Sequence, residues 1–563
     1  MVMLKNKSDF PLGNNVKHVL NTLNLQIFYV FLRANLRQMG TYINKGNGAF
    51  TDIRNDEYVD KSGLIAVINR TLNTERRFSC VTRCRRFGKS MAAEMLCAYY
   101  DQSCHSHELF QDLEISKDDT FEKHLNQYQV IVLDITNFTT RYRKNPNIVD
   151  LLQADVKEEL AEIYSEVKIT EKDDLMATLV KIHASTKQKF ILIMDEWDAI
   201  LREFENVPET KDAFVDLMRR LFKGSESKTI FAGAYITGIL PIKKHNTESA
   251  LNNFEEYSVV APAELAPFFG FNTDEVKQVA TRHNADIEQL RNWYDGYKIG
   301  TEESIYNPYS VMRAARRHEY ISYWSSTGAY DRVSHYIQMN FEGLKDDIIN
   351  MLGGGKCAVK TSKFENDFTA VKSKDDVLTV LIHLGYLSYD SESGKCNVPN
   401  KEVAAELTNA VESTNWKEIV KVIEKSEALL EATLRGNEDL VAQGIDLAHD
   451  ENTSILSYND ENSLSCVISI AYIYARNNYI FHREYATGKG YADIVLIPRN
   501  NIKSPALVIE LKYNQTANTA IDQIKQKQYA DKLAEYSGEV MLVGISYDKE
   551  TKTHTCRIEK MVK

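Results

Sequence analysis

Residues 78–96 read FSCVTRCRRFGKSMAAEML, and this stretch decides the fold of the N-terminal half. The pattern predicts a strand, then a short loop, then a helix. A loop at the N-terminus of a helix aims main-chain N–H groups at an anion. The apolar runs and helix-like stretches that alternate around it, over residues 39 to about 260, are typical of an α/β parallel sheet. The stretch therefore predicts a phosphate-binding loop in such a sheet.

Each residue type in this loop has a chemical reason. Gly88 lets the backbone approach a phosphate, Lys89 can reach the β- and γ-phosphates, and the hydroxyl of Ser90 can bind Mg²⁺. The pattern GxxxxGK[ST] normally begins with a glycine, but this chain has Arg83 there, so the entry to the loop must be built differently. The other residues that we predict to bind the nucleotide in this loop are Arg85, Arg86 and Phe87.

A second apolar strand ends in two acids, in the sequence FILIMDEWDAI at residues 190–200. Asp195 is placed to hold the magnesium shell through water, and Glu196 to orient or deprotonate the attacking water. Transfer of a phosphoryl group to water depends mostly on positioning and charge neutralisation, so these roles fit. The alternative is a strand end that is merely capped by two acids. The pair makes the loop a much stronger indication of ATP hydrolysis.

A further strand, TIFAGAYITG at residues 229–238, ends near Thr237. In ATPases with an extra strand between the two motifs, a polar residue at this place senses the γ-phosphate, and Thr237 is our candidate. An ordinary threonine at a strand end remains the alternative. The strand that holds Asp134 lies between the two motifs, which fits this class. The chain has no NKxD motif, so ATP is favoured over GTP.

The second chemical centre lies in residues 479–515, YIFHREYATGKGYADIVLIPRNNIKSPALVIELKYNQ. Asp493 opens one apolar strand, and Glu510 and Lys512 close the next on the same side, because residues i and i+2 of a strand face alike. Two carboxylates can hold Mg²⁺, which activates water for attack on a phosphodiester, while the lysine positions that water. Glu461, at the start of the preceding helix, can supply a further metal ligand. The alternative is a Glu–Lys pair on an edge strand.

Two neighbouring residues and the local charge support this centre. Glu484 precedes the glycine turn, and Gln523 lies in the following helix, where it can face the same site. From residue 470 onward the chain has 14 Lys and Arg against 10 Asp and Glu, so this part is about +4 in a chain of net charge −11. A basic surface is what contact with a phosphate backbone needs. We therefore expect a nucleic acid, and DNA in particular, as the partner.

Composition limits the remaining possibilities. The 563 residues are 43% hydrophobic and 26% charged, as in a globular protein of several domains. No stretch resembles a membrane span or a signal peptide, so we expect no membrane partner and a cytoplasmic location. The eight cysteines lack the CxxC pairs of structural zinc sites, which favours reduced thiols over a zinc centre near Cys104.

Changes in texture along the chain predict its domains. Residues 1–38 form an N-terminal extension of uncertain role, and residues 39–260 form the α/β domain with the phosphate-binding loop. Residues 261–405 read as a helical lid that ends in a helix and hairpin resembling a winged helix. Residues 406–455 form a helical connector, and residues 456–563 form a second α/β domain with the Asp493 centre.

Many motifs occur in one order along the chain: YVDKSGLIAVI (58–68), TRCRRFGKSM (82–91), DEWDAI (195–200), YITGILPI (235–242), WYDGY (293–297) and YNPYSV (306–311). Together they resemble the AAA-ATPase-like family found mainly in bacteria. Its members commonly carry a C-terminal domain of the PD-(D/E)XK nuclease superfamily, of restriction-endonuclease-like fold, which GKGYADIVLIP followed by ALVIELK resembles. In this family the loop usually reads TRPRRFGKS, so Arg83 is a family trait.

The resemblance implies ATP binding through Lys89 and Ser90, with Asp195 and Glu196 as the Walker B acids. It also implies a metal site at Asp493, Glu510 and Lys512. AAA-type ATPases often complete their site with an arginine of a neighbouring subunit, so a homo-oligomer is expected.

Three hypotheses remain open. The chain is an ATP-dependent nuclease, an ATPase whose C-terminal domain binds nucleic acid without cutting it, or a nucleotide-switched regulator. Intact Asp493, Glu510 and Lys512 favour the first over the second, and intact Glu196 disfavours the third.

Overall fold

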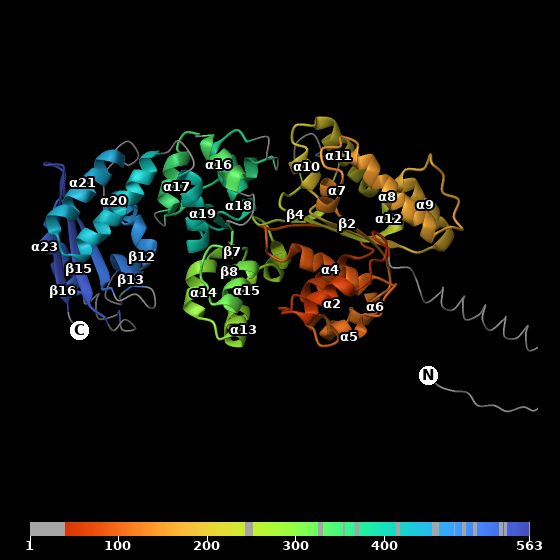
Figure 1. The fold of residues 1–563 in the computed structure, drawn as a ribbon, viewed down its shortest axis with the longest axis horizontal. Helices are drawn as coiled ribbons and strands as arrows, with labels where there is room; N and C mark the ends of the chain where they lie inside the picture. Colours follow the sequence, from red (N-terminus) through yellow and green to blue (C-terminus); the bar gives the residue numbers. More distant parts are fainter. Residues whose placement is uncertain are drawn as a thin grey trace, which may run out of the picture. The chain divides into compact units, whose positions relative to one another are not determined.

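The computed structural model describes residues 40–242, 251–324, 330–339, 341–352, 355–365, 371–412, 417–452, 461–477, 479–486, 491–498, 504–527, 533 and 538–561. The expected N-terminal extension, residues 1–38, lies outside this set. The chain divides into two compact units (Figure 1). The first holds the described residues up to Phe78, Met91–Asp195 and Asn206–Ile236. The second holds Ser79–Ser90, Glu196–Glu205 and the described residues from Thr237 onward.

The N-terminal half contains a parallel five-stranded sheet in the order β2-β3-β4-β1-β5. Its strands are β1 (Phe78–Thr82), β2 (Gln129–Asp134), β3 (Phe190–Asp195), β4 (Phe231–Gly238) and β5 (Glu255–Tyr257). β1 and β4 are buried along their whole length, as expected for strands that are covered on both faces. This confirms the predicted α/β fold, and it brings the carboxyl ends of parallel strands, where ligands bind, to one edge.

Two of the described helices in this half, α7 and α9, begin at an aspartate whose side chain caps the helix. Asp134, the last residue of β2, accepts a hydrogen bond from the main-chain N–H of Asn137 and so caps α7. The helices are α2 (Gly48–Asn55), α3 (Gly63–Thr71), α4 (Lys89–Tyr100), α5 (His107–Phe110), η1 (Glu114–Lys117), α6 (Phe121–His124), α7 (Ile135–Arg141), α8 (Ile148–Ile163), α9 (Leu175–Thr186), α10 (Ala199–Glu203), α11 (Pro208–Lys223) and α12 (Ser227–Ile230).

The middle of the second unit is helical, with two small sheets in the orders β6-β8-β7 and β10-β11-β9. Its elements are η2 (Ala263–Phe268), β6 (Phe271–Asn272), α13 (Thr273–His283), α14 (Ile287–Tyr294), β7 (Tyr297–Ile299), β8 (Glu302–Tyr306), α15 (Pro308–Arg317), α16 (Tyr330–Gln338), α17 (Leu344–Leu352), β9 (Cys357–Ala358), η3 (Thr361–Lys363), α18 (Lys374–Leu384), β10 (Ser388–Asp390), β11 (Lys395–Asn397) and α19 (Lys401–Glu412). The predicted helix and hairpin are α18 with β10 and β11.

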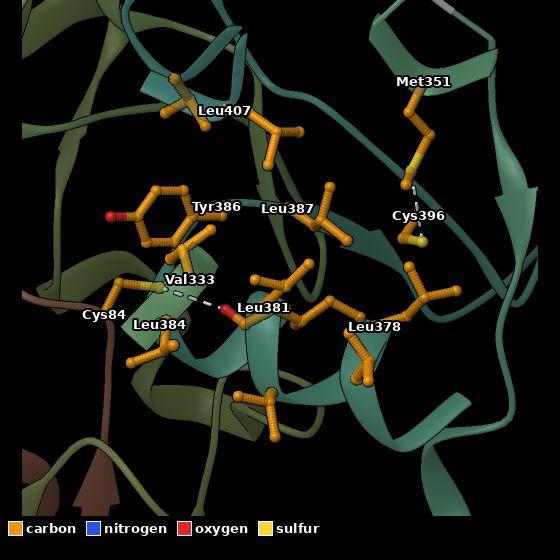
Figure 2. Close-up of a cluster of buried hydrophobic side chains, with 14 of the residues drawn as sticks. Cys84, Val333, Met351, Leu378, Leu381, Leu384, Tyr386, Leu387, Cys396 and Leu407 are labelled. Atoms are coloured by element: carbon orange, nitrogen blue, oxygen red, sulfur yellow. Dashed lines mark hydrogen bonds between the residues drawn. The ribbon is translucent and has the colours of Figure 1, made fainter. Parts of the chain in front are cut away.

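Helix α18 lies inside the core of this region. Every residue from Asp376 to Leu384 is buried, so the helix has no free face for a nucleic-acid groove. It ends at Gly385 with φ +91°, where a Cβ would lie 2.8 Å from the Cβ of Cys84. Cys84 and Phe87 of the phosphate-binding loop belong to the same hydrophobic core (Figure 2). Two residues of the loop are therefore part of the core of the middle region.

The C-terminal region is a mixed sheet in the order β12-β13-β14-β15-β16, in which only β14 and β15 are parallel among the described pairs. Helices cover both faces: α22 packs on one, and α23 packs on the other. Helices α20 and α21, in the predicted connector, also contribute to its core through Leu429, Leu430, Val441 and Ile445. The elements are α20 (Lys417–Leu434), α21 (Glu438–Asn452), α22 (Glu461–Ala471), η4 (Ile473–Asn477), β12 (Tyr479–Ala486), β13 (Tyr491–Pro498), β14 (Ala506–Tyr513), α23 (Ala517–Gln526), β15 (Val540–Asp548) and β16 (Thr553–Met561).

Candidate functional site

Arg83 builds the entry to the phosphate-binding loop, where the usual pattern has glycine. Its guanidinium is fully buried and donates hydrogen bonds to the carbonyls of Thr82 (2.8 Å), Tyr257 (2.7 Å) and Leu265 (3.1 Å). It also lies over the ring of Phe269, 4.9 Å from the ring centroid. The charge of Arg83 is therefore used to anchor the loop and is not exposed to a phosphate.

The turn of the loop leaves room for an anion. Gly88 has φ +91°, a conformation that suits glycine, and a Cβ added there would meet no atom within 4 Å. This open side, next to the N-terminus of α4, fits a phosphate approaching main-chain N–H groups. Phe87 is buried in the core, so its side chain faces away from that space, and the hydroxyl-bearing Ser90 is exposed.

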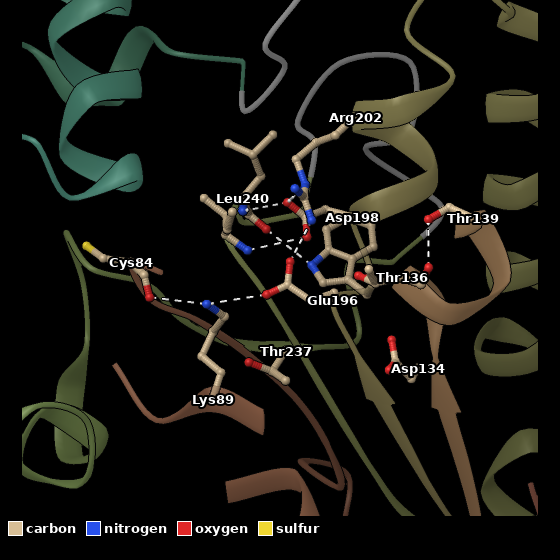
Figure 3. A network of polar contacts seen from close by, with 12 residues as sticks. Cys84, Lys89, Asp134, Thr136, Thr139, Glu196, Asp198, Arg202, Thr237 and Leu240 are labelled. Carbon is tan, nitrogen blue, oxygen red and sulfur yellow. Dashed lines mark hydrogen bonds and ion pairs between the residues drawn. The ribbon is translucent and has the colours of Figure 1, made fainter. Parts of the chain in front are cut away.

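Lys89 lies between the loop and the acid at the end of β3 (Figure 3). Its Nζ donates to the carbonyl of Cys84 at 3.1 Å and forms an ion pair with Glu196 Oε1 at 3.5 Å. Only 5% of the residue is exposed. The two residues that the sequence assigns to phosphate binding and to catalysis thus meet in the structure.

Glu196 is held on its other oxygen by Arg202, whose Nη2 lies 2.5 Å from Oε2. Arg202 is in turn paired with Asp198 at 3.0 Å. Burial raises the pKa of Glu196, but the charges of Lys89, Arg202 and Arg85 outweigh it and hold that pKa below its ordinary value. Glu196 also has φ +51°, an uncommon conformation for a residue with a side chain. The carboxylate is therefore ionised and fixed in direction.

Asp198 ties this arrangement to the segment after β4. It is fully buried and accepts hydrogen bonds from the main-chain N–H groups of Ile239 (3.3 Å) and Leu240 (3.1 Å). Thr237, at the end of β4, is also buried, and its hydroxyl donates to the carbonyl of Val81 at 2.8 Å. To contact a γ-phosphate, this hydroxyl would have to leave the carbonyl of Val81. The role of Thr237 as a γ-phosphate sensor stays a prediction.

Asp195 ends β3 in register with Asp134 of β2. Two carboxylates therefore close neighbouring parallel strands. Asp134 uses its side chain to cap α7, and the role of Asp195 in the magnesium shell stays a prediction.

The C-terminal centre brings together the residues that the sequence predicts. The carboxylate of Asp493, on β13, accepts a hydrogen bond from the main-chain N–H of Leu511 at 2.7 Å. On β14, Lys512 Nζ lies 3.5 Å from Glu510 Oε1. Gln523 of α23 donates its amide to the same oxygen. Glu510 and Lys512 are 1% and 7% exposed, so this cluster is buried on the face of the sheet that α23 covers.

The second oxygen of Glu510, Oε2, is buried and makes no hydrogen bond to the described residues. Burial and the charge of Asp493 raise the pKa of Glu510 to about 7, although Lys512 opposes this shift. Two close carboxylates, one with a free buried oxygen, are the ligands that Mg²⁺ prefers, so the residues fit this ion.

Other metal ligands are not evident in the described part of the chain. No group of three or more His, Cys, Asp or Glu side chains gathers there as a metal site. Glu461 begins α22, on the face opposite α23, and its side chain, like that of Glu484, lies outside the described set. Its role as a ligand stays a prediction.

Sequence reasoning missed the partners that hold these residues. Asp198 lies in a stretch quoted only as a motif, and Arg202 lies two residues beyond it. Their i,i+4 spacing allows an ion pair between them, but it does not predict that Arg202 also holds Glu196.

Comparison with known proteins agrees with this geometry. Residues 45–247 match the family model described as predicted AAA-ATPase, and residues 459–556 match that of the PD-(D/E)XK nuclease superfamily. The chain therefore carries an AAA-ATPase-like domain and a C-terminal domain of the PD-(D/E)XK superfamily, which confirms the resemblance seen in the sequence.

Two individual proteins are similar to the chain. One is the "Uncharacterized protein in vnfD 5'region" of Azotobacter chroococcum mcd 1, 22% identical over 395 residues, which are 66% of this chain and 72% of that protein. The other is the structure of the Aeropyrum pernix ORC1 protein in complex with DNA, with 12% identity and a TM-score of 0.24 over 68% of this chain and 99% of the other. A TM-score of this size does not establish a shared fold.

A search of the described residues for membrane-spanning helices found none that is both long and apolar enough.

Proposed function

We propose that this chain binds and hydrolyses ATP, and that its C-terminal domain cuts nucleic acid, DNA in particular, with Mg²⁺ under the control of the ATPase. The observation that carries the proposal is the convergence of Asp493, Glu510 and Lys512, with a buried carboxylate oxygen left free. A chain that only binds nucleic acid has no need to bury Glu510 beside a second carboxylate, that of the half-buried Asp493, because burial of like charges is costly.

At the nucleotide site, Lys89 changes partners. It leaves the Cys84 carbonyl and Glu196 for the β- and γ-phosphates, while Gly88 lets the loop backbone approach them. Glu196, still held by Arg202, is then placed to orient the attacking water. Ser90 and Asp195 are the residues that would hold the magnesium ion of the nucleotide, which neutralises charge on the phosphates.

At the nuclease site, Asp493 and Glu510 would hold the ion. Bound Mg²⁺ supplies an activated water and neutralises charge that develops on the scissile phosphate. Lys512 positions the water, and Gln523 fixes the direction of Glu510 by its hydrogen bond. The positive balance of the chain from residue 470 onward supports attraction of a phosphate backbone.

The decisive test is a cleavage assay of wild type and Glu510→Gln in parallel, on single- and double-stranded DNA, with Mg²⁺ or Mn²⁺ and with or without ATP. Glu510→Gln keeps the shape of the side chain but removes the metal-binding charge, so we expect cleavage by the wild type alone. If the variant cuts equally well, another site or a contaminant does the chemistry. If neither cuts, the C-terminal domain binds nucleic acid without cleaving it, which is the second candidate function.

The ATPase half is tested by Lys89→Ala. Because Lys89 is the cation that we assign to the β- and γ-phosphates, the variant should lose ATP binding and turnover. Unchanged binding would show that the loop assignment is wrong. Arg76→Ala, at an exposed position outside the loop, is the matched control.

A further inference from the structure

The side chain of Arg86 leaves the loop in which its main chain lies. Arg86 has φ +68° and sits two residues before Gly88, so its backbone belongs to the proposed phosphate cradle. Its Nη1, however, donates to the carbonyl of Tyr323 at 2.6 Å. The guanidinium also lies over the ring of Tyr309, 4.1 Å from the centroid. One residue thus joins the phosphate-binding loop to the middle region.

Tyr323 passes this connection on to α19. Its carbonyl accepts from Arg86, and its N–H donates to Glu402 Oε1 at 2.8 Å. Ser310, next to Tyr309 on α15, donates to the same oxygen at 2.9 Å. One turn further along α19, Glu406 accepts from Ser322 at 2.7 Å. Ser322 and Tyr323 therefore hold the first two turns of α19, and Arg86 in turn binds the carbonyl of Tyr323.

Glu402 is an unusual end point for such a path. It is fully buried, and among the described residues its Oε2 has no hydrogen-bond partner. Burial raises its pKa to about 8, against the hydrogen bonds from Tyr323 and Ser310 and the charge of Arg86. A buried acid with one unused oxygen has a second arrangement available when the positive charge of Arg86 moves. A path that transmits a signal needs such an element with two states.

We propose that the contacts from Arg86 through Tyr323 to Glu402 transmit nucleotide occupancy of the phosphate-binding loop to α19. The inference rests on the proposed function, because it takes the loop to bind ATP. A phosphate bound by the loop backbone shifts Arg86 relative to Tyr309 and Tyr323, and their hydrogen bonds carry the shift to Glu402. Through these contacts, binding of ATP at the loop changes α19, which lies outside the nucleotide site.

The chain after α19 leads to the nuclease-like domain. Helix α20 is the next described element, and its Leu429 and Leu430 belong to the core of the C-terminal sheet. A change at the start of α19 therefore acts on a segment that ends in that core. By linkage, a ligand whose affinity is changed by bound ATP through this path must change the affinity for ATP by the same factor. For coupled sites this factor is typically about 5- to 150-fold.

Hydrogen–deuterium exchange on the full chain, with and without Mg-ATP, tests this. Exchange of the amides in residues 401–412 should change by about fivefold or more when ATP is added to the wild type. Tyr309→Ala removes the ring that holds Arg86 and should abolish this response while ATP still binds. Ser310→Ala removes one of the two hydrogen bonds that hold Glu402 Oε1 and should weaken the response. Arg313→Ala removes a second cation over Tyr309, at 4.6 Å, and should keep the response.

The outcomes separate two failures. If residues 83–90 gain no protection and ATP does not bind to the wild type, the proposed function fails. If ATP binds and protects residues 83–90 but residues 401–412 exchange at the same rate as before, the path is wrong. The path is also wrong if Tyr309→Ala and Ser310→Ala respond as the wild type does.

Discussion

Arg83 shows how a single residue replaces the conformational freedom of a glycine. The guanidinium is fixed by three carbonyls from separate segments and by the face of Phe269, so the loop is held by its side chain. Lysine cannot replace Arg83, because it has three donors on a single nitrogen, whereas a guanidinium has five in a rigid planar fork. The stability of the loop therefore depends on a residue that contacts no phosphate.

Arg83→Ala should destabilise the chain although it removes a large charged group. The substitution leaves buried carbonyls without their donor, which costs on the order of 3 kcal/mol or more. Urea or thermal unfolding of both proteins measures the loss. The exposed Arg76→Ala should stay within about 0.5 kcal/mol of wild type. Equal unfolding of Arg83→Ala and wild type would contradict the anchoring role.

Glu402 should make stability depend on pH. Its folded pKa of about 8 lies above the value of about 4.3 in an unfolded chain. The contribution to stability is therefore complete below the unfolded pKa and is lost as pH rises towards 8, at up to about 1.4 kcal/mol per pH unit. Arg86 and Glu406 are the charged groups that face it.

Glu402→Gln keeps an acceptor for Tyr323 and Ser310 but removes the titration. Its unfolding free energy should therefore rise relative to wild type between about pH 5 and 8, the window of the shift. Denaturant unfolding across this range checks it. Two curves that stay parallel would show that Glu402 does not hold a proton in the folded chain.

At the scale of elements, the strands predicted from the sequence are those that are buried on both faces. β1, β2, β3, β4, β13 and β14 lie within a few residues of the stretches in which strands were predicted, because continuous apolar runs are a strong signal for buried strands. β5, β12 and β16 were not predicted. β5 and β16 are edge strands with exposed, charged residues such as Glu255 and Lys560, and β12 is the opposite edge of its sheet.

Helix α23 contributes directly to the nuclease centre through Gln523. Gln523→Ala removes the hydrogen bond that directs Glu510, so Mg²⁺ or Mn²⁺ affinity should fall by about 10- to 100-fold. Titration calorimetry with the metal measures this without reference to cleavage. Gln526→Ala, on an exposed position of the same helix, should bind as the wild type does. Equal affinities for all three proteins would mean that Gln523 does not orient a ligand.

At the scale of the whole molecule, the sequence predicts which chemistry is present but not how its parts are held. Lys89, Glu196, Asp493 and Glu510 are predictable because metal and phosphate chemistry demands these residue types at these strand ends. The clamp of Arg202 and the contacts of Arg86 are not, since their partners come from segments far away in the chain, such as Tyr323 and Glu402. No local pattern specifies such pairs.

Removal of divalent metal should separate activity from folding. With EDTA, ATP hydrolysis and DNA cleavage should both stop, while the free energy of unfolding falls only by the binding contribution, about 3 kcal/mol at a hundredfold excess of metal over its Kd. The described cores are apolar and contain no three-ligand metal cluster. Calorimetry with and without EDTA, followed by readdition of Mg²⁺, checks this. Irreversible unfolding in EDTA would reveal a structural metal.

The burial of Cys84 gives the chain a built-in reporter. The thiol is 1% exposed, faces the carbonyl of Ile382 at 3.6 Å, and burial raises its pKa to about 11. A thiol in that state does not react with alkylating reagents. Labelling of Cys84 therefore requires the loop to part from α18, and mass spectrometry of the labelled peptide over time would count how often it does so.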